Sequence, residues 1–140
     1  MLRIRIMVAI ACALGLATVG CSSSSSSSAA EGGIAATEAD FSISVSPSSA
    51  TAGEVTFTVT NNGPSTHEFL VVKSDKDPAS LPVENDIVPE DNLDVVDEIE
   101  DIAPGTAPTL TVDLEAGAYI LLCNIATHYE QGMHTGFTVS

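Results

Sequence analysis

The chain has 140 residues, with 19 acidic and 4 basic side chains and a formal net charge of −15. An acidic chain of this kind repels phosphate backbones, which excludes nucleic acid as an expected partner. The length allows one small domain with one core beyond the N-terminal segments, and no internal repeat is visible.

The first 20 residues have the pattern of a secretion signal. Arg3 and Arg5 precede an apolar stretch, 6–19, that is too short to span a bilayer comfortably and is followed by polar residues. The ending Val19-Gly20-Cys21 resembles a lipoprotein signal, in which the cysteine becomes the lipidated N-terminus. We therefore predict a signal peptide over 1–20 and lipidation of Cys21, with plain secretion as the alternative. The mature protein is then extracytoplasmic, in the periplasm or on the outer face of the cell membrane, and touches the membrane only through its lipid.

A serine-rich segment follows the predicted signal. The run from Ser22 to Ser28 and the small residues after it cannot bury apolar surface, which is typical of a flexible tether. We expect a tether over 21–36 and a single folded domain over 37–140.

Alternating apolar residues predict the first strands of this domain. Every second residue is apolar in 41–45, beginning with Phe41, and in 55–59, which indicates two half-buried strands. Residues 47–53 supply a turn between them, and 61–64 end the second strand with Asn-Asn-Gly-Pro. A third strand is expected over 67–72, with one of its two faces directed inward; the faces consist of His67, Phe69 and Val71, and of Glu68, Leu70 and Val72.

The rest of the chain continues as strands after one long excursion. Residues 73–92 are rich in Pro, Asp and Glu and show no firm periodicity. Residues 93–102 fit either a short strand or a helical turn. Strands are expected over 109–114, 118–123 and 137–139. Several short strands without a long helical pattern predict an all-β, two-sheet sandwich.

Cys123 is the residue that points to function. Cys12 lies in the predicted signal and Cys21 in the lipidation motif, so Cys123 would be a lone thiol in an exported domain, where a free thiol is a liability unless something ligates it. An inert buried cysteine is the ordinary alternative. However, His128 and Met133 follow in the same loop, and His67 stands far upstream.

Thiolate, imidazole and thioether groups together are the ligand set of a mononuclear copper site for electron transfer. Cys123 would supply the thiolate, His67 and His128 the imidazoles, and Met133 a weak axial sulfur. Taken singly, a histidine in a strand is more often structural, and a methionine usually fills a core. His134 is expected to be a surface imidazole, although it would replace His128 if the loop kinked.

These residues resemble the cupredoxins, the small blue copper proteins of the plastocyanin and azurin kind. The pattern C-x4-H-x4-M and the His67-Glu68-Phe69 segment match the four ligands of that family, and the loop is most similar to that of rusticyanin. The resemblance covers about 41–140 and implies a Greek-key sandwich with one copper ion, Cu(I) or Cu(II), near one end. It also implies that electrons pass through an exposed edge of His128, ringed by Ala126, Tyr129 and Met133.

One residue departs from the family pattern. Glu68 stands where the family often has asparagine, but a bond from its backbone amide to the cysteine sulfur uses no side chain and should survive. The amide of Ile125 is a second candidate donor to the sulfur. Such bonds stabilise the reduced state, which predicts a fairly high potential.

The sequence thus predicts an exported one-electron carrier with a single copper ion, a monomer and not an enzyme. Its expected partners are redox proteins, with a basic cytochrome-like protein or an oxidase as examples. A copper-trafficking or copper-storage protein is the alternative from another class, and a zinc-loaded structural sandwich is a third. The carboxylate-rich stretch 84–101 is expected to be a solvated face without a calcium site, with docking of a basic partner as the functional hypothesis.

Overall fold

The computed structural model describes residues 33–140. The predicted signal peptide, Cys12 and the lipidation site Cys21 lie outside the described residues. Strand β1 (Ile34–Ala39) begins inside the range 21–36 expected for the tether, so the folded domain starts earlier than residue 37. Its inward residues Ile34, Ala36 and Glu38 alternate, but small and acidic side chains hide the pattern in the sequence.

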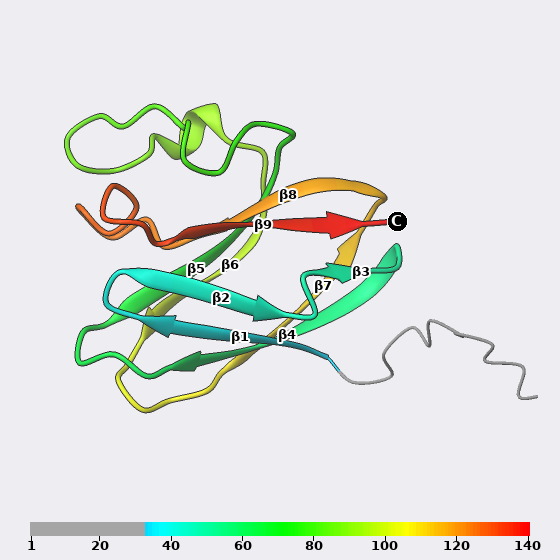
Figure 1. Ribbon diagram of the computed structural model, residues 1–140, viewed down its shortest axis with the longest axis horizontal. Helices are drawn as coiled ribbons and strands as arrows, with labels where there is room; N and C mark the ends of the chain where they lie inside the picture. Colours follow the sequence, from blue (N-terminus) through cyan, green and yellow to red (C-terminus); the bar gives the residue numbers. More distant parts are fainter. Residues whose placement is uncertain (1–32) are drawn as a thin grey trace, which may run out of the picture.

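Two packed sheets form the domain (Figure 1). One sheet has the order β2-β1-β4-β7 and contains β1, β2 (Ser42–Ser46), β4 (Gly53–Asn61) and β7 (Thr109–Leu114). The other has the order β3-β9-β8-β5-β6 and contains β3 (Ser49–Ala50), β5 (His67–Lys73), β6 (Val95–Ile102), β8 (Gly117–Leu122) and β9 (His134–Val139). The chain crosses between the sheets after β2, β3, β4, β6 and β7, so the predicted Greek-key sandwich is confirmed.

Within residues 33–140 the only helix is η1 (Glu90–Asn92), a single 3-10 turn. No helix in this range is long and apolar enough to cross a membrane. The pairings β1 with β4 and β3 with β9 are parallel and the others antiparallel.

The main core lies between the sheets and is centred on three aromatic rings. The ring of Phe57 from β4 lies 5.5 Å from that of Phe69 on β5 and 5.3 Å from that of Phe137 on β9, measured between centroids. All three side chains are buried because alternate residues of each strand face the opposite sheet. The period-two patterns over 55–59 and 109–114 are therefore confirmed as half-buried strands.

A second apolar cluster covers the outer side of β5 and β8. Leu70 and Val72 of β5 and Ile120 and Leu122 of β8 are buried there beneath residues of the segment between β5 and β6. One face of 67–72 points into the main core, as expected, but the other face is buried as well. Both faces are covered, because the long excursion folds back over the sheet.

Two further differences concern single segments. Phe41 was expected inward in a strand, but it is 40% exposed and lies in the turn between β1 and β2. Of residues 93–102, for which the sequence fits either a short strand or a helical turn, 95–102 form strand β6, which pairs with β5.

Candidate metal centre

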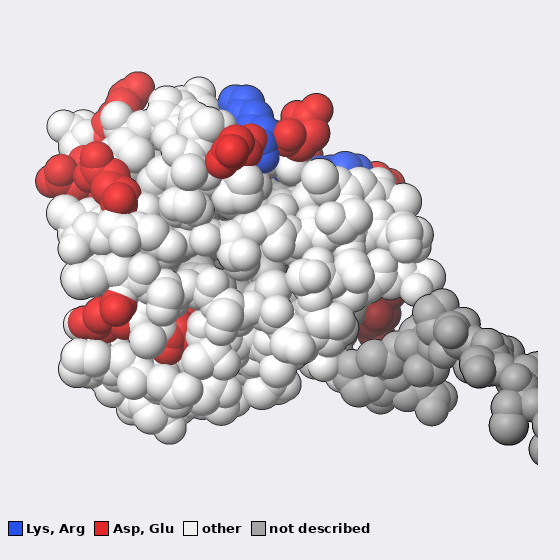
Figure 2. All heavy atoms as spheres, in the orientation of Figure 1, with Lys and Arg blue, Asp and Glu red and all other residues white. Residues whose placement is uncertain are grey.

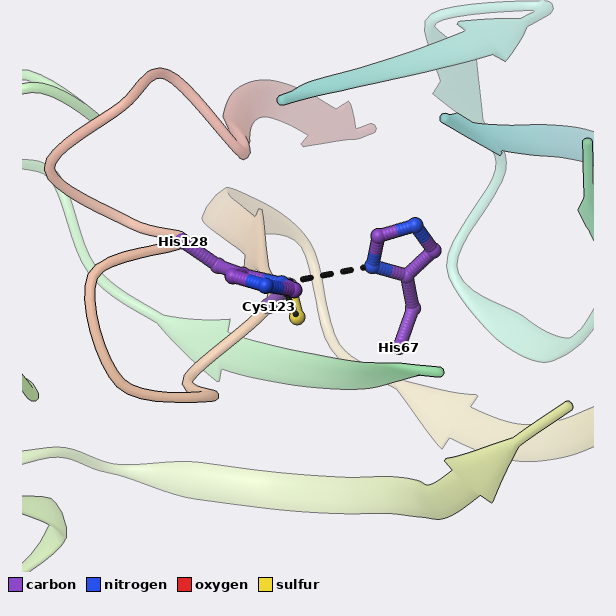
Figure 3. A group of neighbouring side chains, drawn as sticks. All are labelled: His67, Cys123 and His128. Atoms are coloured by element: carbon purple, nitrogen blue, oxygen red, sulfur yellow. Dashed lines mark hydrogen bonds between the residues drawn. The ribbon is translucent and has the colours of Figure 1, made fainter. Parts of the chain in front are cut away.

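Three of the predicted ligands converge at one end of the sandwich (Figure 3). His67 is the first residue of β5, Cys123 directly follows β8, and His128 lies in the loop beyond it. The Nδ1 atoms of His67 and His128 are 3.3 Å apart, and Cys123 Sγ is 3.4 Å from His128 Nδ1. One donor atom from each residue lies within 4.8 Å of the others. Residues more than fifty positions apart therefore meet, because β5 and β8 are neighbouring strands.

Met133 closes the same loop. Its amide donates to His128 O at 3.1 Å, and its carbonyl accepts a hydrogen bond from Cys123 N at 3.0 Å. The Met133 side chain is fully buried in the core cluster that also contains Cys123. The first and last residues of the loop, Cys123 and Met133, are therefore hydrogen-bonded to each other. Met133, the fourth predicted ligand, is buried in the protein interior.

The ligand loop, 123–133, contains a glycine, Gly132, in a backbone conformation with positive φ that favours this residue. Gly132 has φ of +114°, and a Cβ added there would lie 3.2 Å from Phe41 O. Thr127 also has a positive φ, of 71°. These conformations let the backbone return sharply from His128 to Met133.

The His67 ring is oriented by Asp40, from the turn between β1 and β2, and by the loop that precedes β5. Its Nε2 lies 3.2 Å from Asp40 Oδ1, which leaves Nδ1 directed toward His128 and Cys123. A Cβ at Gly63 would lie 2.7 Å from Asp40 Oδ1 and 3.0 Å from His67 Nε2, so glycine allows this approach. A carboxylate on the distal nitrogen of a histidine is a common support for a metal-ligating imidazole.

Asn61 holds this loop in shape. Its Nδ2 donates to Ser65 O and Ile102 O, both at 2.8 Å, and its Oδ1 accepts from Gly63 N at 2.9 Å. All three hydrogen bonds of the Asn61 side chain are made to backbone groups. They fix the end of β4 relative to the loop that leads into β5.

The electrostatics around the two buried ligands favour a neutral imidazole and a protonated thiol. Burial, and secondarily the neighbouring His128, lower the pKa of His67, while Asp40 opposes the shift. A hydrogen bond from the Ser65 hydroxyl, at 2.8 Å, is the main reason that the pKa of Asp40 is lowered. Burial raises the pKa of the Cys123 thiol to about 11, and backbone hydrogen bonds from Ile125 and Glu68 offset part of it. Metal binding must therefore displace the thiol proton.

The predicted bond from the amide of Glu68 to the cysteine sulfur is confirmed. Glu68 N donates to Cys123 Sγ at 3.4 Å. The Glu68 carboxyl points elsewhere and has a pKa raised to about 7, first by burial and then by the neighbouring carboxylates, led by Glu90. Its oxygens lie within 4.8 Å of those of Glu90 and Glu98. Part of the predicted acidic face thus borders the site, and a hollow beside it is lined by Glu68, Glu100, Asp101 and Ile125.

The surroundings of His128 differ from the expected ring of residues. Tyr129 is only 3% exposed and Met133 is buried, so neither forms an exposed rim, whereas Ala126 is exposed. Phe41 takes that place: its ring meets the His128 ring edge-on at 5.7 Å between centroids. The sequence offered no signal for this contact, because Phe41 reads as a strand residue.

His134 does not join the cluster. It begins β9, is partly buried, and its ring lies 4.9 Å from that of Tyr129. Burial lowers its pKa.

The donor atoms fit one copper ion. Two ligand atoms bound to the same ion at distances of about 2.0–2.3 Å lie roughly 3.5 Å apart. The donor atom of His128 has spacings of 3.3 and 3.4 Å to those of His67 and Cys123, and all three atoms lie within 4.8 Å of one another. A buried thiol beside two imidazoles, with a thioether packed behind them, provides the soft ligands that copper requires in both oxidation states.

Comparisons with known proteins support the fold. No protein-family model and no curated protein matches the chain. Among solved structures, reduced auracyanin from the photosynthetic bacterium Roseiflexus castenholzii is 19% identical, with 76% of this chain and 94% of that chain covered and a TM-score of 0.56. An azurin from the methylotroph Methylomonas sp. strain J is 19% identical, with 79% and 99% covered and a TM-score of 0.56. The copper protein rusticyanin is 20% identical, with 76% of each chain covered and a TM-score of 0.54.

Similarity at these identities establishes the shared architecture. The packing of the strands into two sheets agrees with it. The chain therefore has the cupredoxin fold, and its residues fit a single copper site.

Proposed function

We propose that the protein is a mononuclear blue copper protein that carries one electron at a time between redox partners outside the cytoplasm. The observation that carries the proposal is the convergence of His67, Cys123 and His128 from separate elements of the sandwich. Nδ1 of His128 lies 3.3 Å from Nδ1 of His67 and 3.4 Å from Sγ of Cys123. The solved copper protein rusticyanin shares the fold.

The arrangement suits electron transfer because the ligands are held by the protein. Copper supplies the change between two oxidation states. The Asp40 carboxylate and the backbone around Gly63 orient His67, and the amide of Glu68 fixes the sulfur of Cys123. Ligands held in this way move little between oxidation states, which keeps the barrier to electron transfer low.

His128 offers the route to a partner. It is the one predicted ligand of the four that is partly exposed; the other three are buried. Phe41 extends an apolar surface beside it. A partner docked on this surface would lie close to the site without entering the core.

The test is spectroscopic. Purified protein loaded with one equivalent of Cu(II) should show an intense thiolate charge-transfer band in the orange-red region, and Cys123→Ser should abolish it. His67→Ala and His128→Ala should each lose or strongly change the band, and Met133→Leu should shift it. His134→Ala is the matched control and should leave the band unchanged. A colourless wild-type preparation, or a loss of colour with His134→Ala alone, would overturn the assignment.

Retention of the metal separates a carrier from a copper-delivery protein. A carrier should hold copper against a chelator and exchange electrons rapidly between its own oxidised and reduced forms. Ready loss of copper to the chelator together with slow electron exchange would favour trafficking or storage instead.

Export and anchoring are part of the proposal. The signal over 1–20 and the lipid on Cys21 would place the domain at the outer face of a membrane, and the mass of the mature N-terminus tests both. An unmodified N-terminus beyond Cys21 would contradict the lipid anchor and leave the copper proposal standing.

A further inference from the structure

The segment between β5 and β6, residues 74–94 and hereafter the outer segment, lies beside the ligand loop 123–133 (Figure 1). The sandwich does not need this segment to connect its strands, because β5 and β6 are antiparallel neighbours that a short turn would join. Its contacts with the ligand loop are the reason to assign it a role.

Asn124, the residue after Cys123, is paired with the backbone of the outer segment. Its Oδ1 accepts from Val88 N at 2.8 Å, and its Nδ2 donates to Val88 O at 2.9 Å. The same Nδ2 donates to Glu90 Oε1 at 2.9 Å. Asn124 and Val88 are both buried, so losing the Asn124 amide would leave the Val88 N–H and C=O groups unpaired away from water, which is unfavourable.

Tyr129, the residue after His128, makes a second pair of bonds to the outer segment. Its hydroxyl donates to Pro78 O at 2.6 Å and accepts from Leu81 N at 2.9 Å. Between the two, Thr127 N donates to Asp86 O at 2.7 Å. The residues that bond the outer segment are therefore sequence neighbours of the predicted ligands: Asn124 follows Cys123, and Thr127 and Tyr129 stand on either side of His128.

The outer segment is itself anchored. Leu81 and Val88 are buried in the second apolar cluster against Leu70, Val72 and Leu122. Because the outer segment is packed on β5 and β8, it can hold the ligand loop in a fixed position relative to those strands. A segment exposed to solvent on all sides could not do so.

We propose that the outer segment is a brace that positions Cys123 and His128 through Asn124 and Tyr129 and limits their movement when the redox state changes. The proposal rests on the proposed function, since it names positioning residues for the same site. Asn124 and Tyr129 do not touch the metal; they act through the ligands beside them.

The first experiment compares two tyrosines. Tyr129→Phe removes one hydroxyl that bonds the outer segment, and Tyr119→Phe removes one that donates to Glu115 O at the far end of β8. Both tyrosines are 3% exposed, so the two changes are matched in burial. We expect Tyr129→Phe to bind one equivalent of copper, to shift the visible band and to slow electron self-exchange several-fold. Tyr119→Phe should change neither property. Equal band positions and equal self-exchange rates in the two variants would overturn the brace.

The second experiment uses the metal-free protein. Hydrogen exchange by NMR should show the amides of Leu81, Val88 and Thr127 protected in the wild type. Asn124→Ala should raise exchange at Val88 many-fold, whereas Asn92→Ala, at an exposed asparagine of the same segment, should not. Wild-type amides that exchange as fast as those of an unstructured peptide would end the proposal even if no variant folds. A wild type that is colourless with Cu(II) would instead end the proposed function, so the two failures are distinguishable.

Discussion

Phe41 has an unusual backbone conformation, and its side chain contacts the predicted ligand His128. Its φ is +68°, in the left-handed region, and its ring meets that of His128 edge-on. Holding a non-glycine residue in that region costs about 1–2 kcal/mol. The turn between β1 and β2 therefore keeps a strained residue at the surface of the site, which is common where the backbone serves function.

Replacing Phe41 should separate strain from contact. Phe41→Gly should be more stable than Phe41→Ala by about 1 kcal/mol, because only glycine relieves the strained φ while both lose the ring. Urea denaturation of the two metal-free variants measures the difference. The control pair is Val96→Gly and Val96→Ala, at an exposed position in β6, where glycine should be the less stable. The same order at both positions would contradict the assignment of strain.

Glu38 is a buried carboxyl without a hydrogen-bond partner among the described residues. It is fully buried in β1, and neither of its oxygens is bonded. Burial is the main reason that its pKa is raised to about 8, with Glu68 adding to the shift. The folded protein therefore holds this proton at pH values where the unfolded chain, with a pKa near 4.5, has released it.

The consequence is a stability that falls as the pH rises. Between about pH 4.5 and 8 the folded state binds more protons at Glu38 than the unfolded state, so the free energy of unfolding should decrease by up to about 1.4 kcal/mol per pH unit. Glu38→Gln should flatten this dependence in urea titrations of the metal-free protein at pH 5 and pH 8. Glu54→Gln, at an exposed site, should retain the wild-type slope. A wild type that is as stable at pH 8 as at pH 5 would show that Glu38 is solvated or paired.

At the scale of elements, the aromatic cluster joins the two sheets. Phe57 on β4 lies between Phe69 and Phe137 of the facing sheet, with no exposed surface. Cores packed at this density relax little around a deleted side chain. The metal site, which is assembled from β5, β8 and the ligand loop, needs rigid strands. That rigidity therefore depends on the aromatic packing between the sheets.

Phe57→Ala should destabilise the protein by about 3–5 kcal/mol, because it removes a large buried ring and leaves a cavity between the sheets. Chemical denaturation of the metal-free form gives the value, and Val96→Ala at the surface is the control, expected within about 0.5 kcal/mol of wild type. A loss below about 1 kcal/mol for Phe57→Ala would mean that the sheets repack around the gap.

At the scale of the whole molecule, negative charge gathers near the site. Figure 2 shows acidic side chains at the end of the molecule where the ligand loop lies in Figure 1, with no lysine among them; the lysines lie along the upper edge of this face, where further acidic side chains neighbour them. Glu100 and Asp101 are exposed beside Ile125, two residues from Cys123. A field of this kind raises encounter rates with a basic partner more than it raises affinity.

Electron transfer to a basic c-type cytochrome should therefore slow as salt rises. Neutralising Glu100→Gln with Asp101→Asn should lower the bimolecular rate constant at low ionic strength and flatten its salt dependence, since these charges are screened over about 8 Å at physiological salt. Glu54→Gln with Asp113→Asn removes the same charge from paired residues of β4 and β7 at the opposite end and should have little effect. Salt-independent rates in the wild type would argue against a charged docking surface.

Local patterns explain why much of the fold could be predicted. The strands over 55–59 and 109–114 and the chemistry of Cys123, His128 and Met133 depend on residues close together in the chain. Strand β1 escaped prediction because Ile34, Ala36 and Glu38 give no clear apolar period, and one of its two partners, β4, is not the next strand in the chain. Glu38 is polar but lies inward because it shares a face of β1 with Ile34 and Ala36, and the packing of the two sheets buries that face.

The residue types alone predict the donor set, since thiolate, imidazole and thioether groups carry their metal preference wherever they are placed. The sequence also predicts the all-β class, because period-two alternation suits a half-buried sheet and no helix. Three features could be known only from the folded protein. Nδ1 of His67 faces the site, the ring of Phe41 rather than that of Tyr129 lies at the exposed side of His128, and the outer segment is hydrogen-bonded to the ligand loop. Each of these depends on contacts between residues remote in the chain, whose geometry is set by the packing of two sheets and not by any local pattern.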